Sequence, residues 1–123
     1  MTREAFEQVT QEMFDSLPDR FRSAVENVHV VVEDAETQEQ RKKVGLRRNS
    51  MLLGLYEGIP LTRRGTEYGA YPVVPDKITL FQHNIETVCT TDDEVRHAIR
   101  DVLIHELGHY FGMTERDIRD AGY

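Results

Sequence analysis

Two histidines and a glutamate form the pattern His-Glu-x-x-His near the end of the 123-residue chain. His105 and His109 are four residues apart, so on a helix both imidazoles lie on one face, one turn apart. Two ring nitrogens placed in this way can share a Zn²⁺ ion. Glu106 follows the first histidine and points beside the metal, where it can orient a water molecule and take its proton. The pattern therefore predicts a zinc site with Glu106 as general base.

A catalytic zinc site of this kind takes a third ligand from the protein. The segment continues as HExxHxxGxxE, with Gly112 where the chain turns back under the metal and Glu115 at the last position. A carboxylate oxygen is an accepted zinc ligand, so Glu115 is the first choice. Asp117 is the competitor, but it stands three residues after Thr114 and better suits the cap of a short last helix. Without a metal, Glu115 would be an ordinary first-turn acid favoured by the helix dipole.

The residues before the motif predict the helix that must position it. Thr91 and Glu94 have the spacing of a capping box, and apolar residues then recur every three or four positions. Gly112 stands where a left-handed residue ends a helix. We therefore predict a long helix over 90–112, followed by a short helix over 115–120.

The N-terminal part predicts two helices, a strand and a polar loop. Apolar residues recur with helical spacing over 3–15, and Pro18 suits the first turn of a second helix over 18–26. β-branched residues predict a strand over 28–34. Residues 34–48 are polar and predict a loop, in which a short, frayed helix can form.

Two further strands are predicted over 51–58 and 77–86. Gly54 inside the first of them would either weaken the strand or allow another part of the chain to approach closely. Residues 59–76 are rich in proline and glycine and predict a long irregular connection. Because helices and strands come in separate runs, the order predicts an α+β layered fold, and the length predicts a single domain over 1–123.

Composition and charge exclude several classes of function. The formal net charge of −7 argues against general nucleic-acid binding, which requires cations to neutralise phosphates. The single cysteine, Cys89, cannot form an internal disulfide. No apolar run is long enough to span a membrane, and the N-terminus lacks the basic start and apolar run of a secretion signal. We therefore expect a cytoplasmic protein that binds neither nucleic acids nor membranes; the oligomeric state does not follow from the sequence.

Residues 41–64 are locally basic within this acidic chain. They contain seven arginines and lysines, and Glu57 is their only acid. A solvated loop with charged strand ends is the ordinary interpretation. The alternative is a surface that meets an acidic partner or substrate.

The chain resembles the small bacterial zincin-like metallopeptidases, also called minimal zincins. The resemblance covers most of the chain and rests on LGLYEGIPLTRRG at 53–65, PDKITLF at 75–81 and IHELGHYFGMTERDI at 104–118. It implies a minimal zincin-like fold, in which a small mixed β-sheet packs against the HExxH helix, with the N-terminal helices beside them.

The same resemblance implies roles for individual residues. His105 and His109 would bind zinc together with an acid at the position of Glu115, and Glu106 would be the catalytic base. Metzincins share the glycine spacing but have a histidine as third ligand and a methionine turn beneath the metal. Met113 lies inside the motif and is expected to pack against the sheet instead.

The expected activity is hydrolysis of peptide bonds by a zinc-bound water, with a peptide or protein as substrate. The substrate would lie extended along a strand edge, for which KITLFQHN at 77–84 is the candidate. Hydrogen-bond donors to the reaction's oxyanion could come from four side chains, although packing is the favoured role of each: His83, Tyr68, Tyr71 and Tyr110. Two alternatives stay open: a metal-stabilised binding or regulatory domain with little or no hydrolytic activity, and a metal-free interaction domain that uses residues 41–64.

Overall fold

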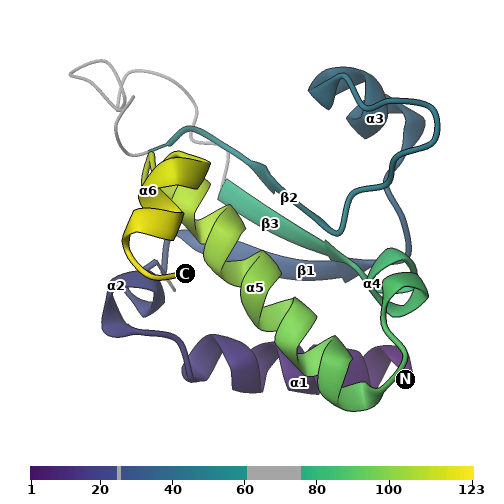
Figure 1. Cartoon of the computed structure of the whole chain (residues 1–123), viewed down its shortest axis with the longest axis horizontal. Coiled ribbons are helices and arrows are strands. Elements are labelled where there is room, and N and C mark those ends of the chain that lie inside the picture. Colours follow the sequence, from purple (N-terminus) through teal and green to yellow (C-terminus); the bar gives the residue numbers. More distant parts are fainter. Residues whose placement is uncertain (25, 61–75) are drawn as a thin grey trace.

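A three-stranded mixed sheet forms the centre of the computed structural model, which describes residues 1–24, 26–60 and 76–123 (Figure 1). The strands are β1 (Val28–Glu33), β2 (Gly54–Glu57) and β3 (Asp76–Phe81), and they lie in the order β1-β3-β2. β1 runs parallel to β3, and β2 runs antiparallel to it. This arrangement confirms the predicted α+β class with a small mixed sheet.

β3 is the central strand, which corrects the prediction that KITLFQHN forms a sheet edge. Its residues Ile78–Phe81 are buried on both faces, as expected for a strand with a neighbour on each side and cover on each face. Ile78 pairs with Val30 on one side and with Tyr56 on the other. Among the strands that the structure describes, β1 and β2 are therefore the outer ones.

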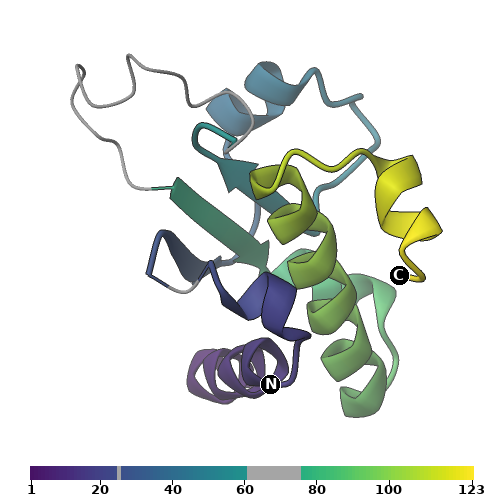
Figure 2. The same ribbon diagram turned by 90° about the vertical axis from the view of Figure 1, so that its left-hand side faces the viewer.

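The helices lie on different sides of the sheet. Figure 1 shows α5 crossing one face of the sheet, with α1 at the β1 side, and Figure 2 shows the same elements turned by 90°, with α1 seen nearly along its axis. The core joins β3 to these two helices through Leu80, Leu103 and Phe6, all of them fully buried. The helices of the described residues are α1 (Arg3–Asp15), α2 (Asp19–Arg22), α3 (Gln38–Val44), α4 (Gln82–Val88), α5 (Asp92–Tyr110) and α6 (Glu115–Asp120). None of them is long and apolar enough to cross a bilayer.

Local sequence signals explain α5, the helix that carries the motif. Thr91 Oγ1 accepts a hydrogen bond from the Glu94 amide at 3.1 Å, as the predicted cap requires. The Glu94 carboxylate bonds the amide of Thr90 at 2.8 Å instead of the Thr91 amide, so the reciprocal half of the capping box is shifted by one residue. Three acids in the first turn complement the helix dipole.

The third predicted strand was wrong in its second half, because 82–88 form α4. Phe81 provides no side-chain cap, and the segment is held by distant partners instead. Gln82 accepts a hydrogen bond from Arg3 at 2.8 Å, and Asn84 donates one to the Leu52 carbonyl at 2.8 Å. Ile85 is fully buried in the core.

Three other predicted elements differ mainly in length. α2 occupies only Asp19–Arg22 of the predicted helix 18–26, in which residue 25 is not described. β2 is shorter than the predicted strand 51–58. The polar loop contains α3, a regular helix with a complete capping box between Thr37 and Gln40. Most of the irregular connection predicted over 59–76 lies outside the described residues.

Candidate metal and catalytic site

His105 is held in one tautomer by the backbone of its own helix. Its Nδ1 lies 2.7 Å from the carbonyl oxygen of Asp101, one turn earlier. Because a carbonyl only accepts hydrogen bonds, Nδ1 carries the proton, and in the neutral ring the lone pair is then on Nε2. The ring therefore presents a metal-binding nitrogen, and the Asp101 backbone rather than its carboxylate orients it.

The end of α5 turns the chain back toward the two histidines. Gly112 has a φ of 77°, which confirms the predicted left-handed cap. The amide of Met113 donates to the Gly108 carbonyl at 2.8 Å, and the Gly112 amide donates to the His109 carbonyl at 3.0 Å. These two bonds form a Schellman motif, which fixes the direction in which the chain leaves the helix.

Gly108 lets α6 pack closely against the last turns of α5. A Cβ at this position would lie 2.6 Å from Ile118 Cδ1, and Ile118 is fully buried. Figure 2 shows α6 folded back beside α5. Sequence reasoning missed this role, although a glycine inside a helix that has a strong motif is a signal for close packing.

The first turn of α6 brings Glu115 to both histidines. One carboxylate oxygen lies 3.4 Å from His105 Nε2, and the other lies 3.6 Å from His109 Nε2. Asp117 is engaged elsewhere, because its carboxylate accepts from the Thr114 amide at 2.9 Å while Thr114 Oγ1 accepts from the Asp117 amide at 3.1 Å. The Thr114 amide is the main reason why the pKa of Asp117 lies below its ordinary value. The predicted cap role of Asp117 is confirmed.

The donor atoms are of types that zinc accepts. Across the described residues, no group of three or more histidine, cysteine, aspartate or glutamate side chains is placed so that it could hold a metal ion without adjustment. Ligand atoms about 2.0–2.1 Å from a tetrahedral zinc lie about 3.3 Å from one another, however. The distances of 3.4 and 3.6 Å between Glu115 and the histidines are close to that value. The Glu115 side chain is exposed and can make the remaining adjustment.

Glu106 lies beside the two histidines and touches the edge of the sheet. Its Oε1 accepts a hydrogen bond from the Tyr56 amide at 2.8 Å and lies 3.5 Å from His109 Nδ1. The pKa of His109 is raised, mainly by its contact with Glu106. Burial acts to lower this pKa, and Glu115 raises it further. The carboxylate is thus positioned by β2 as well as by its own helix.

Tyr56 links this carboxylate to a second, buried acid. Its hydroxyl donates to Asp76 Oδ2 at 2.9 Å, and its ring packs edge-on against Tyr110 with the centroids 6.0 Å apart. Asp76 is only 3% exposed. Neither Tyr56 nor Asp76 was singled out from the sequence, because their connection to the motif depends on how β2 and β3 pack against α5.

Gly54 allows β2 to approach α5 closely, which is one of the two roles predicted for it. A Cβ at Gly54 would come closer than 3.0 Å to Val102 Cγ1 and within 3.5 Å of Glu106 Cγ. Beside this contact is a cavity of about 310 Å³ that borders the motif. The residues that line it are Leu53, Gly54, Asp101, Val102, His105 and Glu106.

The proposed oxyanion donors are only partly placed. Tyr68 and Tyr71 lie outside the described residues. Tyr110 is fully buried, and His83 lies on α4 next to Asp34, whose carbonyl accepts from the His83 amide at 3.0 Å. Met113 is partly buried and packs against the hydrophobic core.

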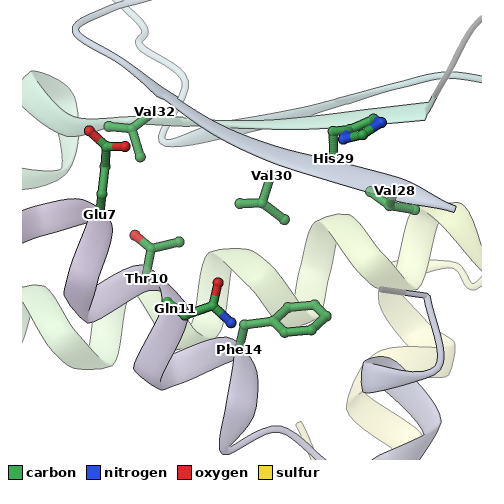
Figure 3. Close-up of a pocket in the computed structure, with 8 residues that line it drawn as sticks. All are labelled: Glu7, Thr10, Gln11, Phe14, Val28, His29, Val30 and Val32. Carbon is green, nitrogen blue, oxygen red and sulfur yellow. The ribbon is translucent and has the colours of Figure 1, made fainter. Parts of the chain in front are cut away.

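A second cavity, of about 290 Å³, lies between α1 and β1 (Figure 3). It is lined by Glu7, Thr10, Gln11, Phe14, Val28, His29, Val30 and Val32. Figure 3 shows the valines of β1 above it and Phe14 of α1 below. None of these residues belongs to the site formed by His105, Glu106, His109 and Glu115.

Comparisons with known proteins agree with this architecture. A solved structure of a conserved hypothetical protein from Thermus thermophilus is similar in fold, with a TM-score of 0.57. Its sequence is 22% identical, and the match covers 90% of this chain and 94% of that chain. A comparison with curated protein sequences found no match. The model of the zincin-like metallopeptidase family matches residues 25–123, a range that includes both histidines, Glu106 and Glu115, and the chain therefore belongs to the zincin-like metallopeptidase family.

Proposed function

We propose that the protein is a zinc-dependent peptidase in which His105, His109 and Glu115 hold the metal and Glu106 is the general base. The observation that carries the proposal is the position of Glu115, within 3.4 and 3.6 Å of the two histidine nitrogens. Two imidazoles and one carboxylate leave a fourth position open, as catalytic zinc sites require. Membership in the zincin-like metallopeptidase family supports the same reaction class.

Each residue has a defined part in the reaction. When bound, zinc would lower the pKa of a water molecule toward neutrality and polarise the scissile carbonyl. Glu106 takes a proton from the attacking water on a carboxylate oxygen and later delivers one to the leaving amine. The Tyr56 amide, 2.8 Å from Glu106, keeps this carboxylate beside the histidines while it does so.

Among the described strands, β2 pairs with β3 on one side only, and its other edge is the surface on which an extended peptide would lie. The Phe81 amide donates to the Leu53 carbonyl, so the backbone polar groups of Leu53 point toward β3. Because these groups point in alternate directions along a strand, those of Gly54 and Tyr56 point away from β3. The bond from the Tyr56 amide to Glu106 agrees with this direction. A peptide added at this edge would lie next to the cavity that borders the motif, whose wall includes Leu53. This edge replaces the one expected at KITLFQHN.

A substitution of the general base tests the catalytic assignment. Glu106→Gln should keep the bound zinc and lose hydrolysis of a mixed peptide library, by a factor of about 10² or more. Asp93→Asn, on the exposed first turn of α5, is the matched control and should keep both. Loss of zinc in Glu106→Gln with the helices intact would mean that Glu106 is a ligand, and unchanged hydrolysis would mean that it is not the base.

The bond between Glu106 and Tyr56 also favours a second candidate, a metal-stabilised binding domain with little or no hydrolysis. In that protein Glu106 would brace α5 against β2 instead of moving protons. A glutamine oxygen can still accept from the Tyr56 amide, whereas alanine cannot. The second candidate therefore predicts that Glu106→Gln is as stable as wild type, that Glu106→Ala is less stable, and that wild-type protein loaded with zinc hydrolyses no peptide.

A further inference from the structure

α3 is a well-formed helix that buries none of its own residues. Thr37 and Gln40 form a capping box at its start, and Gly45 ends it with a φ of 66°. Its contacts with the sheet are polar, because both Gln40 and Lys43 reach Glu57 at the end of β2. Figure 1 shows α3 beyond the β2 side of the sheet, at the opposite side of the molecule from α1. A helix so placed contributes little to the core and presents most of its surface to solvent.

Arg41 orders the loop that follows α3. Its guanidinium donates to the carbonyls of Arg47 and Ser50 at 2.8 and 2.9 Å, and it pairs with Glu36 at 2.7 Å. Glu36 is 8% exposed. Burial acts to raise the pKa of Glu36, but hydrogen bonds, among them those from the Leu52 amide and from Arg41, outweigh burial and lower it. The Arg41 guanidinium is therefore occupied by contacts within the chain, and these contacts hold the loop that follows α3 in place.

The other cations of this region face solvent. Lys42, Arg47 and Arg48 are exposed, and none of them has an ion-pair partner among the residues that the structure describes. Val44 and Met51 are 42% and 43% exposed on the same segment. We call these five residues the α3 patch. An open hollow of about 720 Å³ adjoins the patch, and two patch residues, Lys42 and Arg48, line it. The other residues that line it are Glu36, Gln38, Arg41, Gly45 and Leu46.

We infer that the α3 patch binds an acidic segment of a partner protein that also carries apolar side chains. Residues 36–48 contain five arginines or lysines and two glutamates, a formal charge of +3 in a chain whose net charge is −7. The rest of the chain is therefore more acidic than the whole, so a negative ligand is attracted to the patch and repelled elsewhere. A long nucleic acid would meet that repulsion over a larger area than a short peptide segment. The exposed valine and methionine supply apolar contacts that a protein partner can use.

The inference goes beyond the proposed peptidase and needs no metal. It is tested by fluorescence anisotropy of the full chain with a labelled peptide composed of Glu, Asp and Leu, and with a matched peptide of Gln, Asn and Leu. The patch variant is Lys42→Glu, Arg47→Glu, Arg48→Glu. The control variant reverses three exposed arginines outside the patch and has the same net charge: Arg20→Glu, Arg22→Glu, Arg119→Glu. Circular dichroism confirms that both variants are folded.

The acidic peptide should bind wild type more tightly than the neutral peptide, and its affinity should fall as salt is added. The patch variant should weaken binding about tenfold or more, whereas the control variant should change it much less. Equal weakening in both variants, or no preference for the acidic peptide, would overturn the inference. Binding of single-stranded DNA or of vesicles containing phosphatidylserine in preference to the peptide would overturn it as well, because the patch would then recognise phosphate.

Discussion

Replacing Gly54 by alanine should push β2 away from α5. The new Cβ would lie closer than 3.0 Å to Val102 Cγ1 and 3.2 Å from the Thr79 carbonyl oxygen, where ordinary carbon contacts are about 3.5–4.0 Å. Overpacking of this kind costs about 1–3 kcal/mol, and the lower entropy of the unfolded alanine chain returns about 0.4–1 kcal/mol. We expect a net loss of about 1–2 kcal/mol in the free energy of unfolding, or about 3–10 °C in Tm for a chain of this size.

Urea unfolding followed by circular dichroism can separate this clash from a general effect of alanine. Val102→Ala removes the methyl groups that the new Cβ meets, so Gly54→Ala should cost about 1 kcal/mol less in that background. Part of the cost should persist, because the Thr79 carbonyl remains. The same shift would separate the Tyr56 amide from Glu106, so peptide hydrolysis should fall in Gly54→Ala and recover partly in the double variant. An equal cost of Gly54→Ala in both backgrounds would refute the reasoning.

Further variants test the contacts around the site. Glu36→Gln should lower the free energy of unfolding at pH 7 by about 1–3 kcal/mol, because the carboxylate that pairs with Arg41 loses its charge. Burial acts to raise the pKa of Glu36 in the folded protein, but hydrogen bonds outweigh burial and lower it. The ionised Glu36 carboxylate therefore stabilises the fold at pH values above its pKa in the unfolded chain, and this stabilisation is lost as the pH falls through its pKa in the folded protein. Urea midpoints of wild type and variant should therefore converge in acid; a constant difference would contradict this. Tyr56→Phe loses the bond to Asp76 and should cost about 1 kcal/mol in thermal unfolding, and an unchanged Tm would count against it. Thr114→Ala should cost α6 about 1 kcal/mol, seen as faster amide exchange in that helix alone; exchange as slow as in wild type would argue against the cap.

The helix that carries the motif could be predicted because its signals are local. Thr91 caps it, Gly112 ends it in the left-handed region, and the histidine spacing needs only helical periodicity. The spacing also predicted that Glu115 lies with the histidines, and the structure places it there. Its role as a zinc ligand stays a prediction.

The elements that the sequence did not reveal depend on distant partners. Gln82 is fixed by Arg3, 79 positions away, and Asn84 by Glu36, 48 positions away, so a segment with strand-like residues becomes α4. The Tyr56 amide meets Glu106 across 50 positions for the same reason. Local patterns carry no information on such pairs, so the predicted strand 77–86 continued past the end of β3 at Phe81.

The zinc content per chain, measured by mass spectrometry of the metal, tests the central claim most directly. Wild type should hold one zinc after dialysis against the metal and removal of the excess, and Glu115→Ala should lose it. Asp117→Asn keeps an oxygen that can cap α6 and should retain the zinc, as should Asp117→Ala if the helix is folded. Zinc that survives in Glu115→Ala but is lost in both Asp117 variants would contradict the assignment of the third ligand, and no zinc in wild type would contradict the metal site itself.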